Sequence, residues 1–315
     1  MRPPAQALTD GLLVLLDANY QTAALAPMRG AEAERRRMTE ERKPRTMSPQ
    51  EQARLEAIKK SWQQRKQIGD RTSRIRHKIG VYSGKGGVGK TTVAVNIAVA
   101  LAQQGLAVGL LDVDIDCPNA HRVIGAHEPP AYTDGIFTPA QAWGVKVMSM
   151  GFLQENEEEA IIMRGPMIHN VINQFLQSTE WGDLDYLVAD LPPGTSDAPL
   201  TVMQTLQMDG FVVVTTPQSL AKLDAKRSIN MIRKMNVPVL GVVENMSGDV
   251  FGKGAGEELA REMGTEFLGR LELRPDYRKE DRPTVLASKK VMEEYRVVVA
   301  GMERQLAALA PAATP

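Results

Sequence analysis

Eight consecutive residues, 84–91, restrict the fold of this chain more than any other stretch of its sequence. They read Gly-Lys-Gly-Gly-Val-Gly-Lys-Thr, which fits the phosphate-loop pattern, and they stand between a predicted strand and a predicted helix. Glycines in such a loop let backbone N–H groups approach phosphate oxygens, and the helix that follows adds its positive N-terminal end. We expect Lys90 to neutralise the outer phosphates and the Thr91 hydroxyl to ligate magnesium. The predicted nucleotide site comprises Gly84, Lys85, Gly86, Gly87, Val88, Gly89, Lys90, Thr91 and Thr92.

From about residue 76 onward, short β-rich runs alternate with helical patterns. Most of these runs are continuous stretches of Val, Leu and Ile, which is typical of strands covered on both faces. The alternation predicts right-handed crossovers and a doubly wound α/β fold with a mostly parallel sheet, as in a P-loop NTPase. The predicted strands are residues 78–82, 107–111, 145–148, 186–189, 211–215 and 239–243, and the predicted helices include residues 90–104, 166–177, 220–235 and 289–309.

Acidic residues stand at the ends of two predicted strands. Asp112 and Asp114 follow one strand, and Asp190 ends another. Ligands of this architecture usually bind at the carboxyl edge of the sheet, so these side chains are expected there. Asp190 fits the Walker B carboxylate that contacts magnesium directly or through water. The alternative for Asp112 and Asp114 is a strand-end cap, and Asp116 is interpreted as a helix-entry or loop charge.

A second lysine, Lys85, directly follows the first glycine of the loop. With it the sequence resembles the deviant Walker A P-loop ATPases, a group that includes ParA, MinD, the nitrogenase iron protein and the Mrp/ApbC family. The likeness to the Mrp/ApbC family of iron-sulfur cluster carrier proteins extends, in order, to residues 164–167, 190–195, 215–218 and 244–247. Together with the loop, these motifs span roughly residues 72 to 285.

The resemblance implies an enzyme that hydrolyses ATP with Mg²⁺ and works as a nucleotide-dependent homodimer. In such relatives the lysine that matches Lys85 reaches across the dimer to the partner's phosphates. The resemblance also implies that Asp114 orients or activates the attacking water, and that Asp112 supports the metal shell of Thr91 and Asp190. The implied catalytic residues are Lys85, Lys90 and Asp114, and the carboxamide of Asn245 is implied to pair with adenine.

The sequence departs from the cluster-carrying relatives in its cysteines. Those relatives place a Cys-x-x-Cys pair shortly after the segment that matches residues 244–247, and two chains share one iron-sulfur cluster; the four-cysteine N-terminal motif of the eukaryotic-type branch is also missing here. Cys117 is the single cysteine, whereas a cluster usually takes four thiolates. We interpret Cys117 as a small buried apolar residue, with a metal-binding pair of Cys117 and His121 as the alternative. The sequence therefore predicts no stable cluster of its own, and the implied partner is an iron-sulfur or metalloprotein client.

The N-terminal part of the chain differs from the remainder in charge. Residues 31–78 contain fifteen Lys and Arg but seven Asp and Glu, a net of +8, while residues 79–315 carry −8 in a chain that is neutral overall. We expect residues 1–47 to be partly disordered. Residues 48–75 are predicted to form a basic helical extension that begins with a capping box at Ser48 and Glu51, and residues 76–315 the ATPase domain.

Three functional classes stay open on these grounds. The first is an ATPase for metallocofactor or protein maturation, the second a ParA- or MinD-like positioning or regulatory ATPase acting on DNA, membrane or protein, and the third a nucleotide-binding regulator with negligible turnover. Overall neutrality does not predict a nucleic acid partner. The uncharged run 91–111 is interrupted by polar residues, so no membrane span is expected, and no secretory signal is evident, so we expect the cytoplasm. Mixed charges in the last helix favour a docking helix over a membrane anchor.

Overall fold

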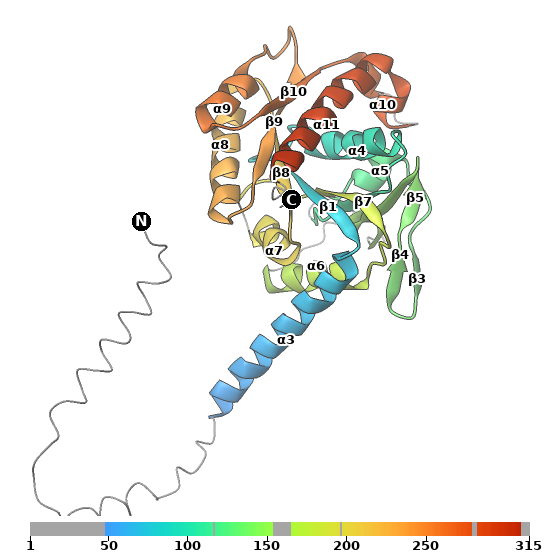
Figure 1. The fold of residues 1–315 in the computed structure, drawn as a ribbon, viewed down its shortest axis with the longest axis vertical. Coiled ribbons are helices and arrows are strands. Elements are labelled where there is room, and N and C mark those ends of the chain that lie inside the picture. Colours follow the sequence, from blue (N-terminus) through green and yellow to red (C-terminus); the bar gives the residue numbers. More distant parts are fainter. Residues whose placement is uncertain (1–47, 116, 154–164, 196, 279–281, 310–315) are drawn as a thin grey trace, which may run out of the picture. The chain divides into compact units, whose positions relative to one another are not determined.

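The computed structural model describes residues 48–115, 117–153, 165–195, 197–278 and 282–309 (Figure 1). The chain divides into two compact units, residues 1–57 and 58–315. Of the first unit, the described part is the beginning of helix α3 (Pro49–Thr72). The predictions for residues 1–47, Asp116 and Arg164 lie outside the described residues.

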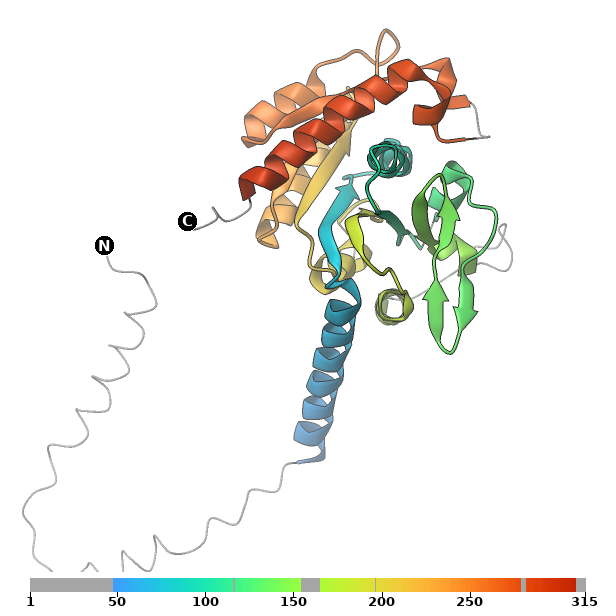
Figure 2. The ribbon, with the colours of Figure 1, turned by 45° about the vertical axis from the view of Figure 1, so that its right-hand side comes forward.

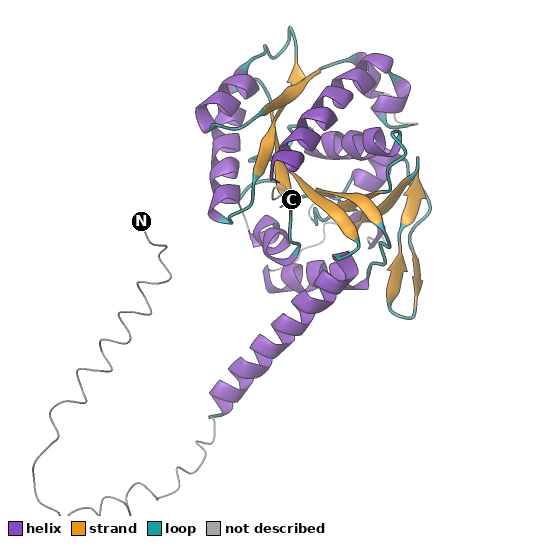
Figure 3. Ribbon diagram, in the orientation of Figure 1, coloured by secondary structure: helices purple, strands orange, loops and turns teal. Residues whose placement is uncertain are grey.

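The second unit is built on an eight-stranded sheet with the strand order β10-β9-β8-β1-β7-β2-β6-β5. Every neighbouring pair in it is parallel except β5 with β6. The predicted doubly wound, mostly parallel sheet is thereby confirmed (Figure 3). Its strands are β1 (Ile75–Tyr82), β2 (Val108–Asp112), β5 (Ala140–Ala142), β6 (Val145–Ser149), β7 (Leu184–Asp190), β8 (Gly210–Thr215), β9 (Val239–Ser247) and β10 (Phe267–Glu272).

All six predicted strands are present, and four others were not predicted. Strands β3 (Ala131–Thr133) and β4 (Ile136–Thr138) form a separate hairpin, and β3, β4 and β5 have three residues each, too few to show a periodicity. Strand β10 contains Gly269 and Arg270, which interrupt the apolar run that marks the other buried strands.

Helices cover both faces of the sheet (Figure 2). One core cluster joins the sheet to α4, α5, α10 and α11, and the other joins it to the last turns of α3 and to α6, α7, α8 and α9. The helices are α4 (Lys90–Ala102), α5 (Ala120–Ile124), α6 (Gly165–Ser178), α7 (Asp197–Thr205), α8 (Ser219–Lys234), α9 (Ala255–Met263), α10 (Thr284–Ala287) and α11 (Lys289–Leu309).

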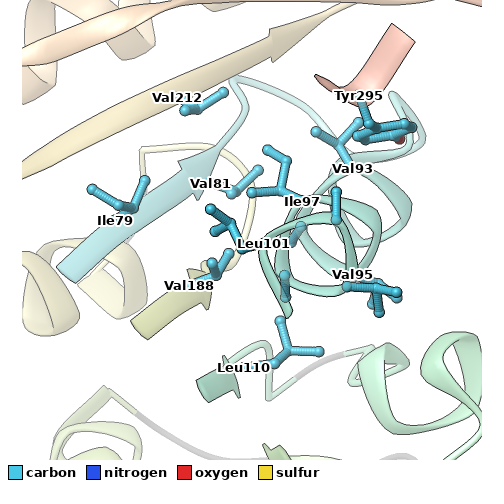
Figure 4. Close-up of a cluster of buried hydrophobic side chains, with 14 of the residues drawn as sticks. Ile79, Val81, Val93, Val95, Ile97, Leu101, Leu110, Val188, Val212 and Tyr295 are labelled. Carbon is cyan, nitrogen blue, oxygen red and sulfur yellow. The ribbon is translucent and has the colours of Figure 1, made fainter. Parts of the chain in front are cut away.

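Helix α4 lies at the centre of the first cluster (Figure 4). It is apolar on nearly all sides, and its side chains from Val93 to Leu101 are buried, as expected for a helix that is covered on every side. Tyr295 of α11 packs against it. The buried stripe of α11 therefore belongs to the core, while the docking role expected for this helix stays a prediction. None of the described helices combines the length and hydrophobicity needed to cross a bilayer.

Helix α3 begins with the predicted capping box. The backbone N–H of Ser48 donates to the Glu51 carboxylate at 2.9 Å, and the backbone N–H of Glu51 donates to the Ser48 hydroxyl at 3.2 Å. Within the second unit, the last turns of α3 carry Ile68 into the core and Arg71 into an ion pair with Glu180.

Candidate functional site

The phosphate loop lies at the carboxyl edge of the sheet, between the end of β1 at Tyr82 and the start of α4 at Lys90. Strand β1 is central, with β7 on one side and β8 on the other. Gly87 and Gly89 have φ angles of 77° and 79°, in the left-handed region where glycine is favoured. The loop thus wraps over the N-terminus of a helix that the core holds in place, which is the geometry of an anion site.

Two positions of the loop also require glycine because neighbouring atoms pack too closely against them for a side chain to fit. A Cβ added to Gly84 would lie 2.2 Å from the carbonyl oxygen of Asp224 in α8, and one added to Gly89 would lie 2.3 Å from Nδ2 of Asn245. Asn245 is buried and donates from Nδ2 to the carbonyl oxygen of Val88 at 2.9 Å. Asn245 therefore connects the end of β9 to the phosphate loop. Its contact with adenine stays a prediction.

A pocket of about 360 Å³ opens at the phosphate loop. Its wall consists of residues of the phosphate loop and the start of α4, of a segment that follows β2, and of Pro192 and Pro193 after β7; the loop and helix residues are Ser83, Lys85, Gly86, Gly87, Gly89, Lys90, Thr91 and Thr92. The segment after β2 contributes Asp114, Cys117 and Asn119. The structure therefore brings together the phosphate loop and one of the two predicted strand-end acidic segments around a single cavity.

Buried charges lie directly beneath the phosphate loop. The Lys90 ammonium contacts Oδ1 of Asp190 at 2.5 Å and lies 4.0 Å from Oδ2 of Asp114. Lys90 and Asp114 are each 6% exposed, and Asp190 is fully buried. The second oxygen of Asp190, Oδ2, has no hydrogen-bond partner among the described residues. A buried carboxylate oxygen with an unused lone pair is what a cation or its bound water would satisfy.

The carboxylate of Asp112 is hydrogen-bonded to other groups of the protein. It lies beside Asp190 on the neighbouring strand, and its oxygens accept hydrogen bonds from the backbone N–H groups of Asp114 and Ala120 and from the hydroxyl of Ser149, at 2.8 to 3.1 Å. Burial, and then the charge of Asp190, raise the pKa of Asp112 above its ordinary value. These contacts fix the turn that carries Asp114, so they favour a positioning role for Asp112.

Cys117 corrects one of our predictions. Its side chain is exposed on the pocket wall, so it is not the buried apolar residue that we expected. The segment is helical only from Ala120 to Ile124, and the ring of His121 is directed to the hydroxyl of Ser149 and to Phe152. The helical spacing that would have aligned Cys117 with His121 is therefore absent.

Lys85 lies on the exposed side of the loop. Its ammonium is 3.5 Å from Oε1 of Gln218, the residue before α8, and its carbonyl oxygen accepts a hydrogen bond from the Ser83 hydroxyl at 2.9 Å. From the sequence, Gln218 was noted only as part of the family motif at residues 215–218. Its place next to Lys85 depends on β8 lying beside β1, which a local motif does not reveal.

Oxygen donors at the site suit magnesium. Thr91 lines the pocket, Asp190 offers the unpartnered oxygen, and Asp112 supports the same sheet edge. Among the described residues, no group of three or more His, Cys, Asp or Glu side chains is arranged to hold a metal ion. Magnesium fits this arrangement, because it usually takes one or two protein oxygens and completes its shell with water and phosphate.

Known proteins resemble this chain in sequence and in fold. Residues 74–306 match the ParA family model that is described as NUBPL iron-transfer P-loop NTPase. The iron-sulfur cluster carrier protein of Methanocaldococcus jannaschii is 44% identical over 253 residues, which are 75% of this chain and 87% of that protein. A nucleotide-binding protein of Archaeoglobus fulgidus, solved in complex with ADP, has a TM-score of 0.62 and 37% identity, covering 74% of this chain and 95% of its own. The cell division ATPase MinD of Pyrococcus furiosus shares the fold, with a TM-score of 0.58 and 22% identity over 73% of this chain and 99% of its own.

Proposed function

We propose that this chain, which belongs to the Mrp/ApbC family of ParA-type P-loop NTPases, binds ATP with magnesium and hydrolyses it to ADP and phosphate as a homodimer. The observation that carries the proposal is the pocket at the phosphate loop, which is lined by the buried Lys90 and Asp114; Lys90 in turn contacts the buried Asp190, whose second carboxylate oxygen has no partner among the described residues. These are the parts that phosphoryl transfer needs, since its catalysis consists of positioning and charge stabilisation.

Each residue of the site has a role in this proposal. The backbone N–H groups of the loop hold the phosphates, and the Lys90 ammonium, which contacts Asp190, lies where a triphosphate would compete for it. Thr91 and Asp190 would hold magnesium, which would supply positive charge to neutralise the phosphate oxygens. Asp114 orients the attacking water and accepts its proton. Asp112 keeps Asp114 in place through the Asp114 N–H.

The proposal is tested by calorimetry and by phosphate release. Titration with ATP and magnesium should give heat of association, and phosphate release per chain should rise with protein concentration until the dimer is saturated. The absence of any heat would remove the proposal. Binding with no turnover would instead assign the chain to the class of nucleotide-binding regulators.

Replacing Asp114 by asparagine should separate binding from hydrolysis. The change should preserve the turn after β2, because Asp114→Asn keeps a side-chain oxygen that can accept the N–H of Cys117, a bond now 3.2 Å long. Loss of a general base typically costs a factor of about 10² to 10⁴ in rate, so turnover should fall within that range while ATP affinity is retained. Stopped-flow phosphate detection and calorimetry on the same preparation measure both quantities. Hydrolysis at the wild-type rate would remove Asp114 from the mechanism.

The protein on which ATP turnover acts is a second part of the proposal. Its relative in Methanocaldococcus jannaschii is named an iron-sulfur cluster carrier protein, while this chain has one cysteine. We infer that ATP turnover serves an iron-sulfur or metalloprotein client whose cluster ligands come mainly from elsewhere, since a cluster usually needs four thiolates.

Anaerobic reconstitution with iron and sulfide checks this inference. We expect no stable chromophore after desalting, because two chains together offer two thiolates. Iron and sulfide analysis with visible absorption provides the measurement. A chromophore that persists in the wild type and disappears in Cys117→Ser would contradict the expectation.

A further inference from the structure

Hydrogen bonds connect Asp112 to the neighbouring strand β6 and, through it, to α5. Asp112 ends β2 and is paired with Ser149, the last residue of the parallel strand β6. The Ser149 hydroxyl donates to Oδ2 of Asp112 at 2.8 Å, and Nδ1 of His121 in α5 lies 3.2 Å from the same hydroxyl oxygen. Ser149 and Asp112 are fully buried. We call Asp112, Ser149 and His121 the hydrogen-bonded trio; neither Ser149 nor His121 has a role in the proposed function.

The hydrogen bonds of Ser149 determine which nitrogen of His121 carries the proton. The hydroxyl has one hydrogen, which it donates to Asp112, and its oxygen also accepts the backbone N–H of Gly151 at 3.1 Å. Its second lone pair needs a donor, so Nδ1 of His121 carries the proton and donates to Ser149. Burial, and then the charge of Arg122, lower the pKa of His121, so the ring is neutral at neutral pH.

The imidazole ring of His121 is fixed by its surroundings. Its centroid lies 5.0 Å from the centroid of the Phe152 ring. On another side the ring packs on Gly151, where an added Cβ would overlap the ring atoms. The ring is therefore held in one orientation, with Nδ1 directed to Ser149, and the donor is in place before any ligand binds.

The carboxylate of Asp112 binds both ends of the segment from Asp114 to Ala120. Oδ1 accepts the N–H of Asp114 at 3.1 Å, and Oδ2 accepts the N–H of Ala120 at 3.0 Å. Within this segment the N–H of Cys117 donates to Oδ1 of Asp114 at 3.2 Å. The orientation of the Asp112 side chain therefore sets where the carboxylate of Asp114 lies on the wall of the phosphate-loop pocket.

Ser149 is the donor that holds Asp112 from outside this segment. The two backbone donors to Asp112 belong to the segment that Asp112 positions, whereas Ser149 belongs to the sheet. Asp190 lies beside Asp112 on β7, and its charge acts against that of Asp112. Without the Ser149 hydroxyl, the carboxylate would keep only its bonds to the segment and could turn away from Asp190 together with it.

We propose that Ser149 and His121 are positioning residues for ATP hydrolysis. His121 donates to Ser149, Ser149 fixes the carboxylate of Asp112, and Asp112 holds Asp114 where it orients the attacking water. The inference rests on the proposed function and deepens it, because it names residues outside the pocket that set the position of its water-orienting carboxylate. Neither Ser149 nor His121 lines the pocket, so turnover depends on them while the affinity for ATP does not.

The test compares pairs of variants that differ in one hydrogen bond. Ser149→Ala removes the donor to Asp112, and Ser149→Thr keeps a hydroxyl at that place. His121→Leu removes the donor to Ser149, and His121→Asn keeps an N–H group near the position of Nδ1. Ser178→Ala is the matched control, because it removes a buried hydroxyl at the end of α6 that accepts a hydrogen bond from Gln174 at 2.9 Å.

Three measurements on each variant give the result. Deuterium exchange of residues 112–121 in the nucleotide-free chain should become at least about 10-fold faster in Ser149→Ala, as expected for the loss of a hydrogen bond to a charged group. Phosphate release should fall by up to about 10²-fold, the effect of a small misplacement of a reacting group, while calorimetry gives an unchanged ATP dissociation constant. His121→Leu should show the same changes to a smaller extent. Ser149→Thr and His121→Asn should restore turnover toward the wild-type rate, and Ser178→Ala should match the wild type.

The outcomes distinguish this inference from the proposed function. Faster exchange and slower turnover at unchanged ATP affinity support the inference. Unchanged turnover in Ser149→Ala, or an equal loss of turnover in Ser178→Ala, overturns it and leaves the ATPase proposal in place. Should Ser149→Ala fail to fold, equal turnover in His121→Leu and His121→Asn overturns it instead. A wild-type chain that binds ATP but releases no phosphate overturns both the proposed hydrolysis and this inference.

Discussion

Replacing Lys90 by alanine is expected to abolish ATP binding at ordinary concentrations. The Lys90 ammonium is the buried cation beneath the phosphate loop, and it lies next to Asp190 and close to Asp114. Without it, the phosphates would approach two buried carboxylates with no lysine between them. Hydrogen bonds to charged groups are worth about 1.5–3 kcal/mol each, so the ATP dissociation constant should rise by about 10²-fold or more. Calorimetry with magnesium and ATP measures this change.

The control for Lys90→Ala must separate binding from folding. Removal of one partner from a buried ion pair costs about 3–5 kcal/mol of stability, so the variant should also have a lower melting temperature. Adding Asp190→Asn to the Lys90→Ala chain removes the carboxylate charge that Lys90→Ala leaves without its partner. The double variant should recover most of the melting temperature and still fail to bind ATP. Binding at wild-type affinity by folded Lys90→Ala would show that this site is not the nucleotide site.

Replacing Lys85 by alanine is expected to leave binding largely intact and to remove turnover. Lys85 lies on the exposed side of the loop and contacts only Gln218 through its ammonium among the hydrogen bonds described, so its loss costs the monomer little. A cation supplied by a partner chain typically contributes a factor of about 10³ to 10⁵ to phosphoryl transfer. The rate per chain should therefore fall by about 10³-fold and should no longer rise with protein concentration.

Mixing two inactive chains tests whether Lys85 acts on the partner. A Lys85→Ala chain retains Asp114, and an Asp114→Asn chain retains Lys85. If the lysine acts across the dimer, the mixture contains one complete site per heterodimer and should recover part of the activity. If mixing recovers nothing while each variant still forms dimers, Lys85 acts within its own chain and the proposed action across the dimer is wrong.

The parts of the site that depend on local sequence could be predicted. The phosphate loop needs a fixed spacing of glycine, lysine and threonine, and Asp190 ends a continuous apolar strand, so both could be placed at the same sheet edge. The order of β8 and β1 could not be predicted, and with it the contact between Lys85 and Gln218 and the close approach of Asp224 to Gly84. These contacts join segments that are far apart in the chain, and no pattern within either segment encodes the pairing.

Cys117 and β10 show the limits of composition. A lone cysteine is buried on average, but Cys117 stands between the Asp114 turn and α5, in a stretch that is shaped by hydrogen bonds rather than by apolar packing. Strand β10 is formed because β9 offers it a free edge and α11 covers it, which compensates for the glycine and arginine in its sequence. In both cases the neighbours of a segment outweigh its own residue types.

The exposed position of Cys117 has a practical consequence. Because it is the only thiol of the chain and lies on the wall of the phosphate-loop pocket, an environment-sensitive dye attached to it would report on that pocket without any engineered residue. If the chain binds and hydrolyses ATP as proposed, one spectroscopic signal from the labelled wild-type sequence would follow nucleotide arrival, cleavage and release in real time.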